Sequence, residues 1–171
     1  MRFITIITAA IAAVMVLTVG ALAANGNQLS PAMACKAQRT AMGEQAFKLL
    51  YGTNADRANA FGNCVSKQAK LQEQNAMNAS QTCATERSSI GEAAFAAKYG
   101  RNKNDGNAFG KCVSQHAQAA QAAQQQKTIS AAKTCKTERQ TLGASAFGNK
   151  YGTNRNKTNA FGKCVSKLMH A

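Results

Sequence analysis

The sequence predicts an all-helical protein made of three tandem hairpins, each closed by a disulfide and joined to the next by a long Ala- and Gln-rich connector that is helical or flexible. Three observations lead to this prediction. A 32-residue unit occurs three times without gaps, at residues 35–66, 83–114 and 135–166. All six cysteines lie in these units, two per unit at one fixed spacing. The apolar residues inside each unit follow helical spacing.

The N-terminus carries the pattern of an export signal. Met1-Arg2 is followed by a stretch without charge from Phe3 to Ala24, which includes the small-residue pattern Ala21-Leu22-Ala23. A basic start, an apolar region and an Ala-x-Ala site are typical of a secretory signal peptide. We therefore expect residues 1–23 to be a signal peptide, 24–34 to be a short N-terminal segment, and the mature chain to be secreted or periplasmic, at the cell envelope. The apolar stretch is also long enough for an uncleaved membrane anchor, which is the less favoured alternative.

The chain is strongly basic, with 21 Lys and Arg against 7 Asp and Glu and a net charge of +14. The surplus is concentrated late in the chain, because Lys133 to Lys167 contain eight basic residues and one acid, Glu138. Such a surplus favours attraction to polyanions: an anionic cell-surface polymer, lipid headgroups or nucleic acid. Export argues against a specific nucleic-acid partner. The alternative is a soluble, self-repelling surface without a specific partner.

The three units agree closely enough to be duplicates of one structural element. We refer to them as repeat 1 (35–66), repeat 2 (83–114) and repeat 3, which with the C-terminus covers 135–171; the connectors are 67–82 and 115–134. Fifteen positions are identical in all three, and in repeat 1 they are Cys35, Arg39, Gly43, Ala46, Phe47, Tyr51, Gly52, Asn54, Asn59, Ala60, Phe61, Gly62, Cys64, Val65 and Ser66.

The cysteines predict three disulfides, since an even number at one spacing in an exported chain is typical of a disulfide framework. Six cysteines allow fifteen pairings. One of these keeps to the repeat and closes every unit on itself: Cys35–Cys64, Cys83–Cys112 and Cys135–Cys164. A unit this small buries little apolar surface alone and needs such a staple. A bridge across about 30 residues contributes roughly 3–4 kcal/mol in the chain-entropy model.

Each repeat begins with two helical stretches. Arg39 and Met42 share a helix face with Cys35, and Phe47 and Tyr51 are again four residues apart. Gly43 between the two stretches predicts a bend or a break.

The rest of the repeat predicts a turn and a returning helix. Gly52 is placed to end the second stretch in the left-handed conformation, and Asn54 suits the turn or the cap that follows. The returning helix carries Phe61, Cys64 and Val65 on one side, so the arms of the hairpin meet through the aromatic residues and the cysteines clamp them.

The connectors predict long exposed helices that fray or are partly disordered. Residues 115–134 are rich in Ala and Gln, which have good helix propensity but offer almost nothing to bury.

Candidate binding residues are basic. Arg39 and its counterparts lie within the cysteine-bearing stripe, where a guanidinium suits carboxylate or phosphate. We favour the alternative that the arginine covers the small core. The candidate anion-binding residues are this repeated arginine and basic residues of repeat 3: Arg39, Arg87, Arg139, Lys150, Arg155, Lys157 and Lys163.

Other chemistry has weaker support. The stretch 102–107 has one acid, whereas calcium requires several carboxylates and carbonyls. Cys112 and His116 are spaced for half of a metal site, but a disulfide-bonded cysteine is not a ligand. The two histidines are not repeated, no acid recurs in all three repeats, and the repeated Ser66 has no evident base. We therefore predict no metal, no cofactor and no catalysis.

The pattern Cys-x-x-Glu-Arg, then Ala-Phe-x-x-x-Tyr-Gly-x-Asn and Asn-Ala-Phe-Gly-Lys-Cys-Val-Ser, resembles repeats in uncharacterised exported bacterial proteins. The resemblance covers most of residues 35–167, although Gln38 departs from the acidic position in repeat 1. It implies an exported repeat protein and no particular activity. The expected function is a non-catalytic, multivalent cationic binding or structural module that contacts anionic polymers at the cell envelope. The alternative, a membrane-active or antimicrobial protein, requires an apolar face exposed beside the basic one.

Overall fold

The computed structural model describes residues 30–171, and within that range all regular secondary structure is helical, which confirms the all-α prediction. The predicted signal peptide, residues 1–23, lies outside the described residues. Among the helices of residues 30–171, none is long and apolar enough to cross a membrane. The helices are α1 (Pro31–Met42), α2 (Glu44–Tyr51), α3 (Ala60–Ile90), α4 (Glu92–Tyr99), α5 (Ala108–Tyr151) and α6 (Ala160–Met169).

A glycine breaks each repeat between its first two helical stretches, as Gly43 predicts. Gly43, Gly91 and Gly143 have φ of 86°, 84° and 77° with ψ of 152°, 157° and 160°. This region of backbone space is essentially restricted to glycine. The break separates α1 from α2 and α3 from α4, and it forms a kink inside α5 in repeat 3.

The prediction of a left-handed Gly52 is wrong, because its φ is −76° and its ψ is 133°, an extended backbone. The left-handed residue is Arg57, with a φ of 57°, and Asp105 and Lys157 repeat this conformation. The Arg57 side chain lies directly over the glycine, and a Cβ on Gly52 would lie 2.4 Å from Arg57 Cβ. Gly52 is therefore required for close approach of the loop to the end of α2.

The three predicted disulfides are present and join the first helical stretch of each repeat to the returning helix. Their Cα–Cα distances are 6.0, 6.0 and 6.1 Å, and all six cysteines are fully buried. Because disulfides persist in oxidising surroundings, they indicate an extracellular or periplasmic location.

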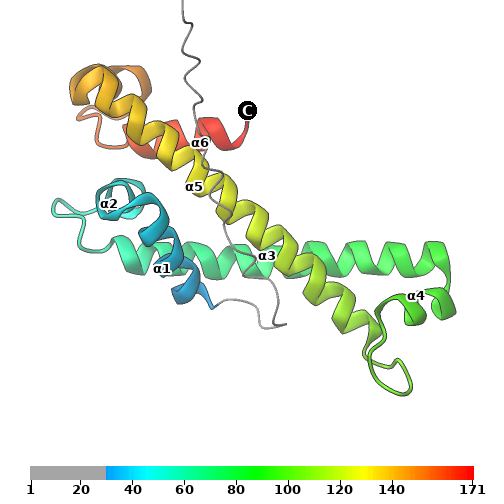
Figure 1. Cartoon of the computed structure of the whole chain (residues 1–171). Coiled ribbons are helices and arrows are strands. Elements are labelled where there is room, and N and C mark those ends of the chain that lie inside the picture. Colours follow the sequence, from blue (N-terminus) through cyan, green and yellow to red (C-terminus); the bar gives the residue numbers. More distant parts are fainter. Residues whose placement is uncertain (1–29) are drawn as a thin grey trace, which may run out of the picture.

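The connectors are continuous helix, and the expectation that they bury almost nothing is wrong. Residues 67–82 lie within the 31-residue α3 and residues 115–134 within the 44-residue α5. The two long helices cross and pack against each other (Figure 1). Small side chains allow this packing, since Ala79 and Ala117 are each only 4% exposed.

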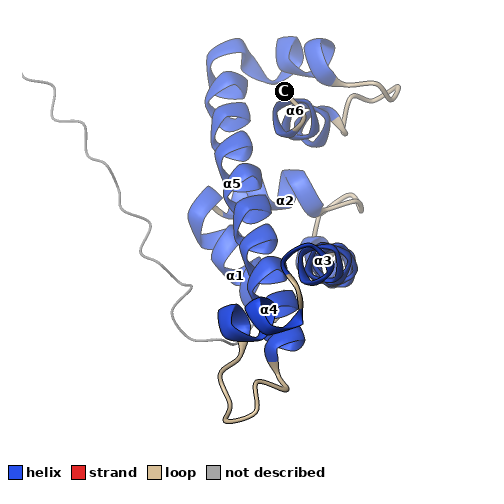
Figure 2. Cartoon of the chain, turned by 90° about the vertical axis from the view of Figure 1, so that its right-hand side faces the viewer, coloured by secondary structure: helices blue, strands red, loops and turns tan. Residues whose placement is uncertain are grey.

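Repeats 1 and 3 share one hydrophobic core, whereas repeat 2 has its own. Met42 and Phe47 belong to the same cluster as Phe147, Phe161 and Val165. The smaller cluster of repeat 2 contains Phe95, Tyr99, Ala108 and the disulfide. Both views place α4 at the opposite end of the long helices from α6 (Figures 1 and 2). The molecule therefore has a large lobe built from repeats 1 and 3 and a small lobe built from repeat 2.

Two positions distinguish repeat 1 from repeats 2 and 3. In repeat 3, Lys150 Nζ lies 2.6 Å from Glu138 Oε1, and repeat 2 has the same contact between Lys98 and Glu86. The corresponding residues of repeat 1 are Gln38 and Leu50. Gln38 is fully buried and accepts a hydrogen bond from Tyr51, while Leu50 packs against the shared core. Repeat 1 thus has two uncharged side chains where repeats 2 and 3 have an ion pair.

Candidate anion-binding cleft

A cleft of about 820 Å³ lies between repeats 1 and 3. The end of α2, the loop after it and the start of α3 form one wall. The other wall is α6 with the loop before it, and Gln124 and Thr128 of α5 also contribute. The cleft therefore depends on the docking of two repeats that are far apart in the sequence, and neither repeat forms it alone.

The lining of the cleft is basic and partly apolar. None of the described residues that line it is acidic. Leu71 of α3 and Met169 of α6 are among its apolar residues. Anionic groups are attracted to such a lining, and the apolar walls strengthen the attraction by excluding water. The basic residues are Arg57, Lys67, Lys163 and His170.

Arg57 holds the two walls together. Its Nη1 donates to the carbonyl oxygens of Lys48 and Leu49, both at 3.3 Å, and of Gly52 at 3.0 Å. Its Nη2 donates to the carbonyl oxygen of Thr158 in repeat 3 at 3.2 Å. Because these donors are engaged with the end of α2 and the opposite loop, Arg57 positions the cleft more than it offers free hydrogen bonds to a ligand.

Lys163 and Lys67 are the cations best placed to meet an anion. Lys163 is exposed, and no hydrogen bond or ion pair is found for its side chain among residues 30–171. Lys67 Nζ lies 5.5 Å from the ring centroid of Tyr51. Burial raises the pKa of Tyr51 to about 12, so the phenol remains neutral and adds no negative charge.

His170 follows α6 and also lines the cleft. Its Nδ1 lies 2.7 Å from the carbonyl oxygen of Ser166. A carbonyl oxygen accepts, so Nδ1 carries a proton that it donates to the helix backbone. The imidazole is held by the last turn of α6 and not by the Ser166 hydroxyl.

A second hollow of about 460 Å³ adjoins the cleft and shares Arg57, Asn156 and Thr158 with it. Arg139 and Lys157 line this hollow, and none of its described lining residues is acidic. Lys157 Nζ donates to the carbonyl oxygen of Gly152 at 3.2 Å. The two hollows together form a basic track along the junction of repeats 1 and 3.

The repeated arginine lacks its glutamate partner in repeat 3. Arg39 Nε lies 3.7 Å from Glu44, and Arg87 Nε lies 3.6 Å from Glu92. Ala144 occupies the place of these glutamates in repeat 3, and no ion pair is found for Arg139 in the described part of the chain.

The structure separates the seven candidate residues that the sequence suggests. Arg139, Lys157 and Lys163 border the cleft and its adjoining hollow. The guanidinium carbons of Arg39 and Arg87 lie 5.7 and 5.1 Å from the ring centroids of Phe61 and Phe109, an arrangement that covers the core. Lys150 is paired with Glu138, and Arg155 is exposed in its loop.

Sequence reasoning missed Lys67 and His170. Neither is identical across the repeats, and the pattern of one repeat does not show which repeats dock. Repeat 1 has the uncharged Gln38 and Leu50 where repeats 2 and 3 have a glutamate and a lysine. This joint loss of two charges was the available sign that repeat 1 has different neighbours.

The Glu–Lys contacts of repeats 2 and 3 also include a tyrosine. Tyr99 donates to Glu86 at 2.9 Å, and Tyr151 donates to Glu138 at 2.8 Å. Hydrogen bonds from Lys98 and then Tyr99 lower the pKa of Glu86. The pKa of Glu138 is lowered in the same way by Lys150 and then Tyr151.

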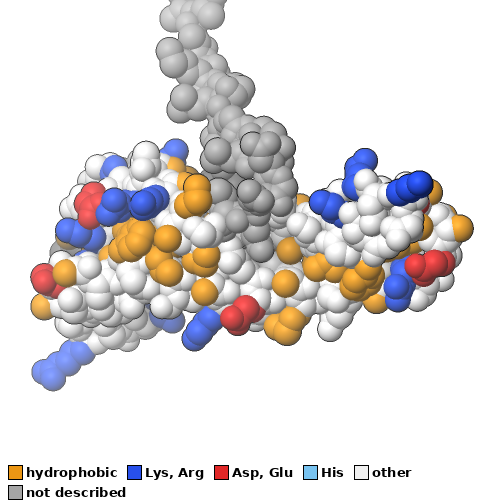
Figure 3. Space-filling view, turned by 90° about the horizontal axis from the view of Figure 1, so that it is seen from below, with side chains coloured by type: hydrophobic (Ala, Val, Ile, Leu, Met, Phe, Trp, Pro, Cys, Tyr) orange, Lys and Arg blue, Asp and Glu red, His pale blue; other side chains and the backbone are white. Residues whose placement is uncertain are grey.

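On the face shown in Figure 3, Lys and Arg side chains lie mainly toward the two ends of the molecule. The fold and the cleft define a disulfide-stapled, all-α repeat protein with a basic junction between two of its repeats. No protein-family model, curated protein or solved structure matches the chain.

Proposed function

We propose that the chain is an exported, non-catalytic binding protein that contacts an anionic polymer of the cell envelope through the cleft between repeats 1 and 3. The observation that carries this proposal is the lining of the cleft: four basic side chains, apolar walls and no acid among its described residues. The disulfides and the predicted signal peptide support export.

The mechanism is electrostatic capture followed by local contacts. The net charge of +14 steers polyanions to the molecule. Lys163 and Lys67 then contact successive anionic groups, and Lys157 and Arg139 extend the track. Each contact is weak, but a polymer engages several at once, which raises the overall affinity.

The polar groups of the cleft support binding more than nucleophilic chemistry. His170 Nδ1 donates to the backbone carbonyl of Ser166, and this contact does not activate a hydroxyl. The large exposed apolar residues also give little support to a membrane-active protein, because they are scattered over four helices: Met33, Met77, Ile90, Leu142 and Leu168.

Binding of polyphosphate of defined length to the mature chain, measured by calorimetry, tests the proposal. Affinity should fall steeply between about 50 and 200 mM salt, because binding releases counterions. Lys67→Ala together with Lys163→Ala should weaken binding and reduce the salt slope by about 2, roughly 1 for each lost contact.

The matched control is Lys103→Ala with Lys111→Ala, which removes the same charge from exposed positions of repeat 2. These changes should have a much smaller effect. Equal losses in the two variants would show that diffuse charge binds the polymer and would overturn the role of the cleft. Affinity that does not respond to salt would contradict the function itself.

A further inference from the structure

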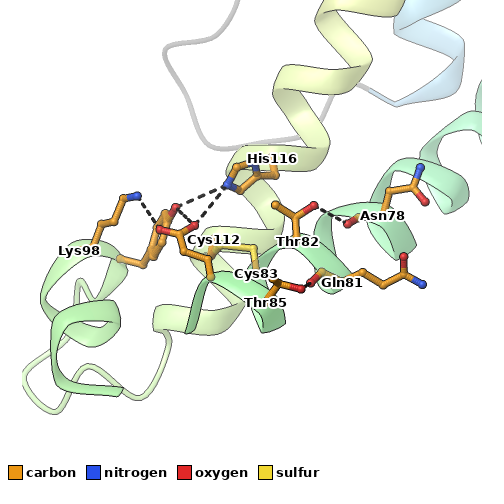
Figure 4. A network of polar contacts seen from close by, with 10 residues as sticks. Asn78, Gln81, Thr82, Cys83, Thr85, Lys98, Cys112 and His116 are labelled. Carbon is orange, nitrogen blue, oxygen red and sulfur yellow. Dashed lines mark hydrogen bonds and ion pairs between the residues drawn. A yellow bond between two sulfur atoms is a disulfide. The ribbon is translucent and has the colours of Figure 1, made fainter. Parts of the chain in front are cut away.

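Repeat 2 contains a cluster of metal-ligating side chains that the other repeats lack. Cys83 and Glu86 are three residues apart on α3, so both face the same neighbour. Cys112 and His116 are four residues apart on α5 and face α3 in turn. Figure 4 shows the imidazole of His116 pointing toward the disulfide region and the polar groups beside it. Two adjacent helices therefore each present two ligand types at one place.

The distances suit a small cation. The ligand atoms of Cys83, Cys112 and His116 all lie within 4.8 Å of one another. His116 Nε2 also lies 3.9 Å from Glu86 Oε2. In a tetrahedral zinc site, with Zn–S of about 2.3 Å and Zn–N of about 2.0 Å, ligand atoms are roughly 3.5–4 Å apart. Separating the two sulfurs and rotating these side chains slightly would create that arrangement.

We propose that repeat 2 binds one thiophilic divalent cation, such as zinc, when its disulfide is reduced. The two thiolates and His116 Nε2 are three ligands, and Glu86 or water is the fourth. In the oxidised chain the sulfurs are bonded to each other at 2.01 Å and do not act as ligands. The site is thus controlled by the redox state of one disulfide.

The chemistry balances with a dithiol as reductant. The dithiol transfers two electrons and two protons, the Cys83–Cys112 bond breaks to two thiols, and the dithiol closes to a cyclic disulfide. When the cation binds, the two thiols release their protons. The oxidation state of the cation does not change. Its bonds to ligands on both helices link α3 to α5 in place of the disulfide.

The residues around the cluster orient the Glu86 carboxylate and leave His116 accessible to a cation. Lys98 and Tyr99 hydrogen-bond Glu86 and orient its carboxylate, as groups around a metal ligand commonly do. The His116 side chain is 42% exposed. An open hollow on α3, lined by Asn78, Thr82 and Thr85 among others, reaches the cluster at Glu86.

The other repeats are internal controls. Repeat 1 has Gln68 in place of His116 and Gln38 in place of Glu86. Repeat 3 retains the acid, Glu138, but has Leu168 at the histidine position. The complete set of two cysteines, an acid and a histidine occurs in repeat 2.

The test is a Co²⁺ titration of the full mature chain, reduced with a phosphine that does not compete as a thiol, followed by displacement with Zn²⁺. Thiolate-to-cobalt absorption should report one cation per chain, and the oxidised chain should give no such absorption. His116→Gln, which installs the repeat 1 residue, should weaken binding by about 100-fold. Leu168→His should raise the stoichiometry toward two.

Circular dichroism of the same samples covers the case in which reduction loosens the fold. One equivalent of Zn²⁺ should then restore helix in the wild-type chain and not in His116→Gln. Equal binding by wild type and His116→Gln would show non-specific thiolate capture and overturn the proposal. Absence of uptake by the reduced wild-type chain would also overturn it.

Discussion

Three glycines recur in every repeat, and their conformations and surroundings differ. Gly43 adopts a positive φ of 86°, and Gly52 lies beneath the side chain of Arg57. A Cβ on Gly62 would meet nothing within 4 Å. The sequence correctly predicted the break at Gly43 but assigned the left-handed turn to Gly52. It erred because the loop places Arg57, and not the glycine, in that conformation.

Two alanine substitutions at sites with open space isolate the effect of a positive φ on stability. At both Gly143 and Gly110 an added Cβ would meet nothing within 4 Å. Gly143→Ala should lower the free energy of unfolding by about 1–3 kcal/mol, because Gly143 has a φ of 77°. Gly110→Ala, inside α5, should raise it by about 0.5–1 kcal/mol. Urea unfolding measures both, and equal effects would contradict the role of the positive φ.

The glutamates of repeats 2 and 3 should make stability sensitive to acid. The pKa values of Glu86 and Glu138 are lowered in the folded chain, mainly by hydrogen bonds from Lys98 and Lys150. Their contribution is complete above the unfolded pKa of about 4.3 and is lost as the pH falls through the lower folded pKa. Glu86→Gln with Glu138→Gln should therefore reduce the loss of stability seen below about pH 4.3. If the melting temperature of this double variant falls at low pH as much as that of the wild type, the assignment is wrong.

At the scale of helices, the equivalent eight-residue helices α2 and α4 have different surroundings. In α2, Leu49 and Leu50 pack against the core that repeats 1 and 3 share. In α4 the corresponding residues are Ala97 and Lys98, and both are exposed. The sequence predicted the hairpin and its disulfide, because these depend on identical residues. The docking of repeats 1 and 3 could not be predicted from the common pattern, since it depends on positions where the repeats differ.

Exchanging these residues tests why repeat 1 docks. Leu50→Lys should lower the free energy of unfolding by about 1–2 kcal/mol, because it places a charge beside the shared core without the acid that repeats 2 and 3 provide. The reciprocal change, Lys98→Leu in repeat 2, removes an exposed ion pair and should stay within about 0.5 kcal/mol. Denaturant unfolding compares the two variants. If they have equal effects, burial of Leu50 does not drive docking.

At the scale of the molecule, residues 30–171 form a large lobe that carries the basic cleft and a small lobe that carries the cysteine–histidine cluster. The charge distribution of the sequence drew attention to repeat 3, which supplies Lys157 and Lys163 to the junction. Lys67 and His170 belong to the same junction because residues of α3 and of the end of α6 line one cleft. Their contribution follows from tertiary packing and has no signature in either segment alone.

Residue-resolved hydrogen exchange of the native chain tests the two-lobe organisation most directly. Amides of α2 and α6 should exchange through a common opening with one free energy, because their repeats share a core. Amides of α4 should open at a lower free energy, since repeat 2 has a smaller core of its own. If α2 instead opens together with α4 and independently of α6, repeats 1 and 3 do not form one folding unit, and the cleft between them loses its structural basis.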